Sequence, residues 1–141
     1  MKNITTNQVC YSGEYLAASM LQRIFSAIAF PLSQQPFDIL CLGKNNTFLK
    51  CQVKTTNYIE NNRKLKYFKF KTAKKLSKED YNKYTEGDID FFAFVCLPKN
   101  LVIFKTRDQV KTHPYFRLKI ESVTEEEQNK SIKHIQKKWS C

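Results

Sequence analysis

The stretch QPFDILCLGKNNTFLKCQVKTT, residues 35–56, predicts two neighbouring strands joined by a tight turn. The strands are expected over residues 37–42 and 47–56, with the turn-like composition Gly-Lys-Asn-Asn between them. Asp38 is a carboxylate inside a run that otherwise predicts a buried strand. A charged group at such a position needs a partner, and the second strand indicates which one.

The side chains of a strand alternate between its two faces, which places Gln52 and Lys54 on the same face. With a three-residue loop, Gly43 pairs with Thr47, and Asp38 then lies opposite Gln52 with Lys54 one step further along that face. A two-residue loop would instead send Asp38 to the other face. A shared site at Asp38, Gln52 and Lys54 therefore depends on the register of this hairpin.

The overall composition favours an intracellular domain with a polyanionic partner. The 141 residues carry 24 Lys and Arg against 13 Asp and Glu, a net charge of +11, which indicates nucleic acid or an acidic membrane. No segment has the ~18 apolar residues of a membrane span, and the N-terminus lacks the order of a signal peptide. The five cysteines form no CxxC pair, which suits free thiols in a reducing compartment. We therefore expect no membrane association, a cytoplasmic location and a prokaryotic or phage source.

Periodicity predicts the other elements. Apolar residues at helical spacing predict a helix over residues 13–30, ended by Pro31. Alternation predicts a strand over residues 64–71, and a Ser-x-x-Asp start predicts a short helix over residues 77–84. Further strands are expected over residues 91–97 and 101–105, and a final helix over residues 124–139. This order predicts an α/β domain with a mostly antiparallel mixed sheet flanked by helices.

The set at the first hairpin suits phosphodiester hydrolysis. The carboxylate of Asp38, the side-chain oxygen of Gln52 and the carbonyl of Val53 can form an oxygen shell for a hard cation such as Mg²⁺. Lys54 could orient or deprotonate a water and stabilise charge on a phosphate. Metal and lysine together relieve the charge repulsion that limits this reaction.

These residues resemble the PD-(D/E)xK nuclease signature. The segment Pro36-Phe37-Asp38 is similar to its proline-aspartate start with one residue inserted, and Gln52-Val53-Lys54 follows after 13 residues. The order of elements is similar to the αβββαβ core of that restriction-endonuclease-like superfamily. Glu14, after Gly13 in the first predicted helix, looks like the extra acidic residue that many members direct towards the metal.

The resemblance implies metal-dependent cleavage of DNA. It assigns Asp38, Gln52, Lys54 and Glu14 to catalysis, and Asp38, Val53, Glu14 and Gln52 to Mg²⁺, with Mn²⁺ as a substitute. Gln52 stands where most members have an acid, a variant that resembles small intron-encoded homing endonucleases. Holliday-junction resolvases are similar in size but typically have an acid there.

A dense basic segment with interleaved aromatic residues is the expected contact surface for double-stranded DNA. A solvated sheet face over a phenylalanine core would give the same pattern. The residues assigned to DNA binding are Lys44, Arg63, Lys64, Lys66, Tyr67, Lys69, Lys71, Lys74 and Lys75.

The sequence thus predicts one nuclease domain over residues 1–141, with a core at residues 12–106 and a helical extension at residues 123–139. The expected function is a site-specific homing or restriction-like endodeoxyribonuclease. A Holliday-junction resolvase and an inactive nucleic-acid-binding module on the same fold are alternatives, and a basic scaffold or ribosome-associated protein is a third. One site per chain cuts one strand, so we expect a dimer or tetramer.

Overall fold

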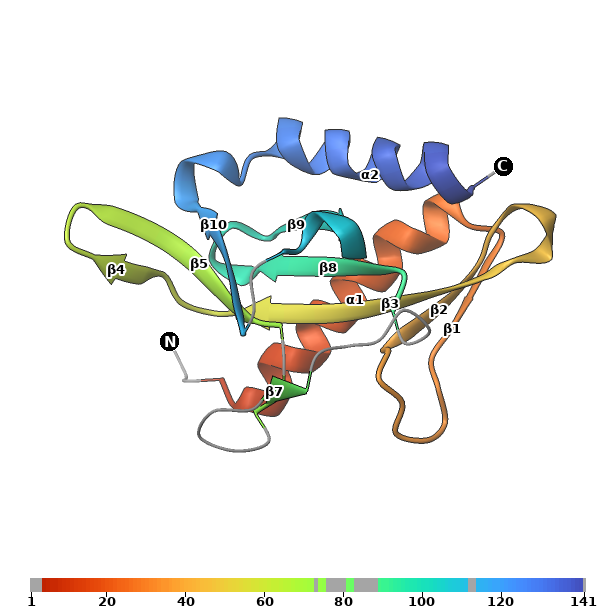
Figure 1. Cartoon of the computed structure of the whole chain (residues 1–141), viewed down its shortest axis with the longest axis horizontal. Coiled ribbons are helices and arrows are strands. Elements are labelled where there is room, and N and C mark those ends of the chain that lie inside the picture. The colour runs from red at the N-terminus through yellow and green to blue at the C-terminus, as the bar shows by residue number, and fades with distance from the viewer. Residues whose placement is uncertain (1–3, 73, 76–80, 83–88, 112–113, 141) are drawn as a thin grey trace.

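The structure is a computed structural model, and it describes residues 4–72, 74–75, 81–82, 89–111 and 114–140 (Figure 1). The helices, strands and short 3-10 turns (η) within these residues are, in chain order, α1 (Thr6–Ile24), β1 (Ala27–Ala29), β2 (Ile39–Leu42), η1 (Lys44–Asn46), β3 (Phe48–Thr56), β4 (Glu60–Asn62), β5 (Leu65–Lys71), β6 (Lys74–Lys75), β7 (Tyr81–Asn82), β8 (Phe91–Cys96), η2 (Leu97–Lys99), β9 (Leu101–Thr106), η3 (Arg107–Gln109), β10 (Tyr115–Lys119), η4 (Ile120–Ser122) and α2 (Glu125–Trp139).

The main sheet has five strands in the order β1-β2-β3-β8-β9. The pair β3 and β8 is parallel and the others are antiparallel, so the predicted α/β class with a mostly antiparallel mixed sheet is confirmed. The hairpin of β8 and β9 matches the two late strands expected from the sequence. None of the helices in the described part of the chain is long and apolar enough to cross a bilayer.

The hairpin of β2 and β3 has the three-residue loop. Gly43 N–H donates to the carbonyl of Thr47 at 2.8 Å, and Ile39 pairs with Cys51. Asn45 and Asn46 in the loop have φ of 58° and 56°, a left-handed conformation that asparagine tolerates better than most residues. The alternative two-residue loop is therefore excluded.

Helix α1 differs from its predicted bounds. It begins at Thr6, because Thr5 and Gln8 form a reciprocal capping box, and it ends at Ile24. The apolar residues that extended the predicted helix to residue 30 instead form β1, where Ala27 pairs with Leu42. The C-terminal helix agrees with its prediction, and the Thr124 side chain caps it by accepting from Glu127 N–H.

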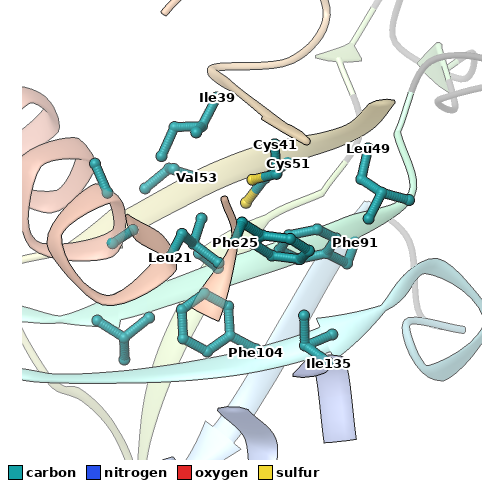
Figure 2. Packing of buried hydrophobic residues seen from close by; sticks show 14 of the residues in the cluster. Leu21, Phe25, Ile39, Cys41, Leu49, Cys51, Val53, Phe91, Phe104 and Ile135 are labelled. Atoms are coloured by element: carbon teal, nitrogen blue, oxygen red, sulfur yellow. The ribbon is translucent and has the colours of Figure 1, made fainter. Parts of the chain in front are cut away.

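Two buried clusters occupy the two faces of the main sheet. On one face, Leu21 of α1 and Ile135 of α2 pack with Cys41, Cys51 and Phe91 of the sheet. Figure 2 shows these side chains meeting between the two helices and the strands. Both helices therefore lie on the same face, where Figure 1 shows α1 passing behind β3 and β8.

A second sheet, ordered β10-β5-β4, covers the opposite face. Its Phe70 and Phe116 place their ring centroids 4.8 and 4.7 Å from that of Phe94 in β8. This arrangement explains why all six residues of β8 are buried. Strand β5 is thus the predicted basic strand, but it pairs with β4 and β10 instead of joining the main sheet.

The short helix expected over residues 77–84 falls mainly outside the described residues. Its described part, Tyr81–Asn82, is strand β7, which pairs with β6. The sequence prediction is wrong for these two residues, because the backbone pairing with Lys74–Lys75 overrides the local capping signal.

Candidate active site

Asp38 is the centre of the candidate site, and the residues of β3 hold it. It immediately precedes β2, where its backbone N–H donates to the carbonyl of Cys51 at 2.9 Å. Its Oδ2 accepts two hydrogen bonds of 2.8 Å, from Gln52 Nε2 and from the backbone N–H of Val53. The predicted contact between Asp38 and Gln52 is therefore present, and the carboxylate is held in a single orientation.

Helix α1 brings Glu14 to this carboxylate because Gly13 lets it cross β3 at very short range. A Cβ on Gly13 would lie 1.7 Å from Thr55 Oγ1 and 2.8 Å from Thr55 Cβ, so no side chain fits between the two elements. The helix backbone therefore rests on β3 at this point, and the next residue, Glu14, lies beside Asp38.

The two carboxyl groups share a hydrogen bond, and both have raised pKa values. Burial raises the pKa of Glu14 first, and the negative charge of Asp38 and the hydrogen bond to it raise it further. For Asp38, burial raises the pKa by more than the Val53 N–H, the charge of Lys54 and the hydrogen bond with Glu14 lower it. Ionisation of both groups is therefore unfavourable unless one of them keeps its proton or a cation binds beside them.

A cleft of about 320 Å³ contains this pair together with the other predicted catalytic residues. Gln52, Val53 and Lys54 line it from β3, and Lys69 and Lys71 line it from β5. The positive charge of Lys54 acts on Asp38. The fold thus gathers two carboxyl groups, an amide and lysines in one solvent-accessible hollow.

The oxygen donors of the cleft suit a hard divalent cation. Two adjacent carboxylates and an amide oxygen are ligands that Mg²⁺ accepts, and the mutual repulsion of the carboxylates is what a cation relieves. Among the residues that the structure describes, no three His, Cys, Asp or Glu side chains are arranged so that they could hold a metal ion by themselves. The fit therefore depends on the amide of Gln52, or a carbonyl such as that of Val53, as a further ligand.

Strand β5 contributes the basic face that its alternation predicts. Phe68 and Phe70 are buried against β8, whereas Lys69 and Lys71 point to the other side, towards the cleft. Tyr67 has the same parity as these lysines and is half-buried. Lys66 has the parity of the buried phenylalanines but is exposed near the start of the strand.

Three neighbours of Lys69 were missed by sequence reasoning. Its Nζ lies 3.8 Å from Glu60 Oε2 and 4.1 Å from the ring centroid of Tyr115, and Arg117 Nε also lies 3.8 Å from Glu60 Oε2. Arg117 and Tyr115 belong to β10, which pairs with β5. Only this long-range pairing brings Arg117 and Tyr115 near Lys69, and no local motif marks either residue.

Three other predicted DNA-binding residues, Lys44, Arg63 and Lys64, are not part of the cleft lining. Lys44 is in η1, at the opposite end of the β2–β3 hairpin from Asp38. Arg63 and Lys64 form the exposed turn between β4 and β5, where Arg63 has a φ of 59°. The backbone of Lys74 and Lys75 forms β6, and the positions of their side chains lie outside what the structure describes.

The buried cysteines are packing residues. Cys41 and Cys51 lie in the core beneath the helices, and burial raises the pKa of the Cys41 thiol to about 12. A thiol with so high a pKa is unreactive near neutral pH. Cys10, which sequence reasoning did not assign, is exposed and lines the cleft beside Glu14.

Comparisons with known proteins agree with this arrangement. A family model described as PD-(D/E)XK endonuclease matches residues 5–140. A bacterial homing endonuclease of known structure, I-Ssp6803I, superposes with a TM-score of 0.65 at 13% sequence identity, over 82% of this chain and 78% of that chain. A search of curated proteins found no match. At this identity the structural likeness concerns the fold.

Proposed function

Because this chain belongs to the PD-(D/E)XK endonuclease family, we propose that it is a metal-dependent endodeoxyribonuclease whose active site is the cleft at Asp38. One observation carries the proposal. The hydrogen-bonded carboxyl groups of Glu14 and Asp38 share one open cleft with Gln52 and Lys54.

Each side chain has a role in this proposal. Asp38, Glu14, the side-chain oxygen of Gln52 and the carbonyl of Val53 would hold Mg²⁺, or Mn²⁺ in its place. Such a cation supplies charge neutralisation at the phosphate and lowers the pKa of water. Lys54 would orient and activate the attacking water and, as an ammonium, stabilise the negative charge that develops on the phosphate.

The substrate proposed is double-stranded DNA, which the net charge of +11 and the lysines of β5 favour. Site-specific cleavage of the homing type is the finer proposal, supported by the Gln-Val-Lys triplet and the fold likeness. One chain forms one cleft, so cutting both strands would require two chains, as a dimer or a dimer of dimers.

One observation favours a second candidate, an inactive DNA-binding module. Gln52 puts a neutral amide where most members have a carboxylate, and an amide binds cations more weakly. The presence of Asp38 and Lys54 in the same cleft argues for activity. The two functions differ in whether DNA is cut.

The test is cleavage of supercoiled plasmid, of a four-way junction and of a library of randomised duplex sites, with Mg²⁺ or with EDTA. We expect Mg²⁺-dependent cutting by the wild type, a loss of about 10³-fold in Lys54→Ala, and no change in Lys130→Ala, which removes an exposed lysine from α2. Preference for the junction would indicate a resolvase. Salt-sensitive duplex binding without cleavage of any substrate would indicate the binding module.

A further inference from the structure

A second hollow of about 510 Å³ adjoins the active-site cleft. Glu14 and Asp38 line both hollows, so the carboxyl pair forms the wall between them. A DNA strand with a phosphate at this pair must continue to either side of it. The second hollow is therefore placed to receive the nucleotide next to that phosphate.

The two hollows differ in charge. Lys54, Lys69 and Lys71 line the active-site cleft, whereas no lysine or arginine among the described residues lines the second hollow. A phosphate is favoured beside the lysines and disfavoured beside two carboxyl groups without a cation. The part of DNA that suits the second hollow is therefore an uncharged one, a base.

The lining of the second hollow matches the chemistry of a base. It contains the amides of Gln34 and Gln35, which both donate and accept hydrogen bonds, and the rings of Tyr11 and Phe30. Such rings offer apolar surface that can contact the edge of a base pair in a duplex, such as the methyl group of a thymine. Gln amides pair with base edges, most favourably with adenine.

These rings are exposed although they are large and partly apolar. The exposed fraction is 57% for Tyr11 and 44% for Phe30. Tyr15 packs against Phe30 edge to face, with centroids 6.3 Å apart and an interplanar angle of 74°. Gln35 Nε2 donates to Ser33 Oγ at 3.2 Å within the segment before Asp38. The hollow is thus built from α1 and from the chain that leads into β2.

We propose that this hollow recognises the base beside the cleaved phosphate, and that Gln34 and Gln35 determine the sequence preference there. The inference rests on the nuclease function proposed above. Tyr11 and Phe30 supply the packing surface, and Glu14 and Asp38 fix the distance between the recognised base and the cleaved bond.

The experiment compares the base preferences of matched variants at each position around the cut. The wild type, Gln34→Ala, Gln35→Ala and the double variant cleave a library of randomised duplexes with Mg²⁺, and sequencing of the cut ends gives the preference at each position. Gln22→Ala, an exposed glutamine near the end of α1, is the control. Sedimentation of each variant and of Leu32→Ser, in the same loop, reports on self-association.

We expect the glutamine variants to lose about tenfold of the preference at the flanking base pairs alone, through slower cutting of the preferred sequence, whereas Gln22→Ala should keep both the rate and the preference of the wild type. Unchanged preferences, or a wild type with no preference beside the cut, would overturn the inference while leaving the nuclease function intact. Dissociation of an oligomer by Gln34→Ala or Leu32→Ser would overturn it too, since a second copy would then cover the hollow. Absence of cutting by the wild type would overturn both proposals.

Discussion

Gln52 donates a hydrogen bond from Nε2 to Asp38 Oδ2 over 2.8 Å, so a neutral amide stands directly beside the central carboxylate. A glutamate at this position could not donate that bond and would add a third negative charge next to Glu14 and Asp38. The amide therefore lowers the repulsion in the metal-free protein, and in exchange it is a weaker ligand for a cation.

Gln52→Glu is predicted to bind Mg²⁺ more tightly and to be less stable without it. We expect about a tenfold gain in affinity from the added carboxylate, measured by isothermal titration calorimetry. In EDTA its thermal midpoint should fall below that of the wild type. Gln22→Glu, which adds the same charge at an exposed site, is the control. An unchanged affinity for Mg²⁺ would mean that residue 52 does not face the cation.

Glu14→Gln is predicted to stabilise the metal-free protein at neutral pH. The folded state binds protons to Glu14 and Asp38 more tightly than the unfolded state does, because both pKa values are raised. The pair therefore costs stability above these raised values, and the cost fades as the pH falls through them. We expect a rise in Tm of about 1–3 °C at pH 7.5 in EDTA, reduced by solvent screening at this half-exposed site.

At about pH 4, which is below the ordinary pKa of a glutamate, Glu14→Gln should no longer raise the Tm. With Mg²⁺ at neutral pH the wild type should instead have the higher Tm. The bound cation stabilises the wild type, and the variant loses part of that stabilisation. Scanning calorimetry at the two pH values, with and without Mg²⁺, makes the comparison. A gain of equal size at both pH values would show that it arises from helix propensity alone.

For the hairpin that carries the site, the sequence left two registers open. The alternation in residues 47–56 predicted that Gln52 and Lys54 share a face, but the contact of Asp38 with Gln52 depended on the loop length, which only the backbone pairing of the folded hairpin shows. The start of α1 could have been predicted. Thr5 and Gln8 fit a capping-box pattern that the periodicity of the later residues obscured.

The pairing of β5 with β10 could not be predicted in the same way. The register Arg117 with Lys69 joins residues far apart in the sequence, and nothing local marks either strand as the partner of the other. The ion pair of Arg117 with Glu60 and the contact of Lys69 with the ring of Tyr115 depend on this pairing, whereas the ion pair of Lys69 with Glu60 spans the local hairpin of β4 and β5. Side-chain neighbours across such a sheet follow from the tertiary fold alone.

Lys69→Met is predicted to weaken DNA binding by removing a phosphate contact at the cleft. Lys69 is held between Glu60 and the ring of Tyr115, so its ammonium is already positioned before DNA binds. Loss of one such contact should lower the slope of log K against log salt concentration by about 0.9. Binding of a duplex in Ca²⁺ at several salt concentrations gives the slope. Lys130→Met on α2 should leave it unchanged, and equal slopes for the wild type and Lys69→Met would exclude the contact.

Gly13→Ala is predicted to destabilise the protein although it places a better helix former inside α1. In an open helix the change would stabilise by about 1 kcal/mol. Here the new Cβ would lie 2.8 Å from Thr55 Cβ, which no rotation of the Thr55 side chain relieves. Overpacking of this kind typically costs about 1–3 kcal/mol, and it would move Glu14 away from Asp38.

The variant should therefore unfold at a lower denaturant concentration and also bind Mg²⁺ more weakly. Ser12→Ala, on the exposed side of the same turn, changes helix propensity without contact with β3 and should be neutral or slightly stabilising. Thr55→Gly removes the atoms that clash, so the pair Gly13→Ala with Thr55→Gly should recover Mg²⁺ affinity relative to Gly13→Ala alone. If the double variant binds Mg²⁺ no better than the single one, the close crossing of α1 over β3 is not what positions Glu14.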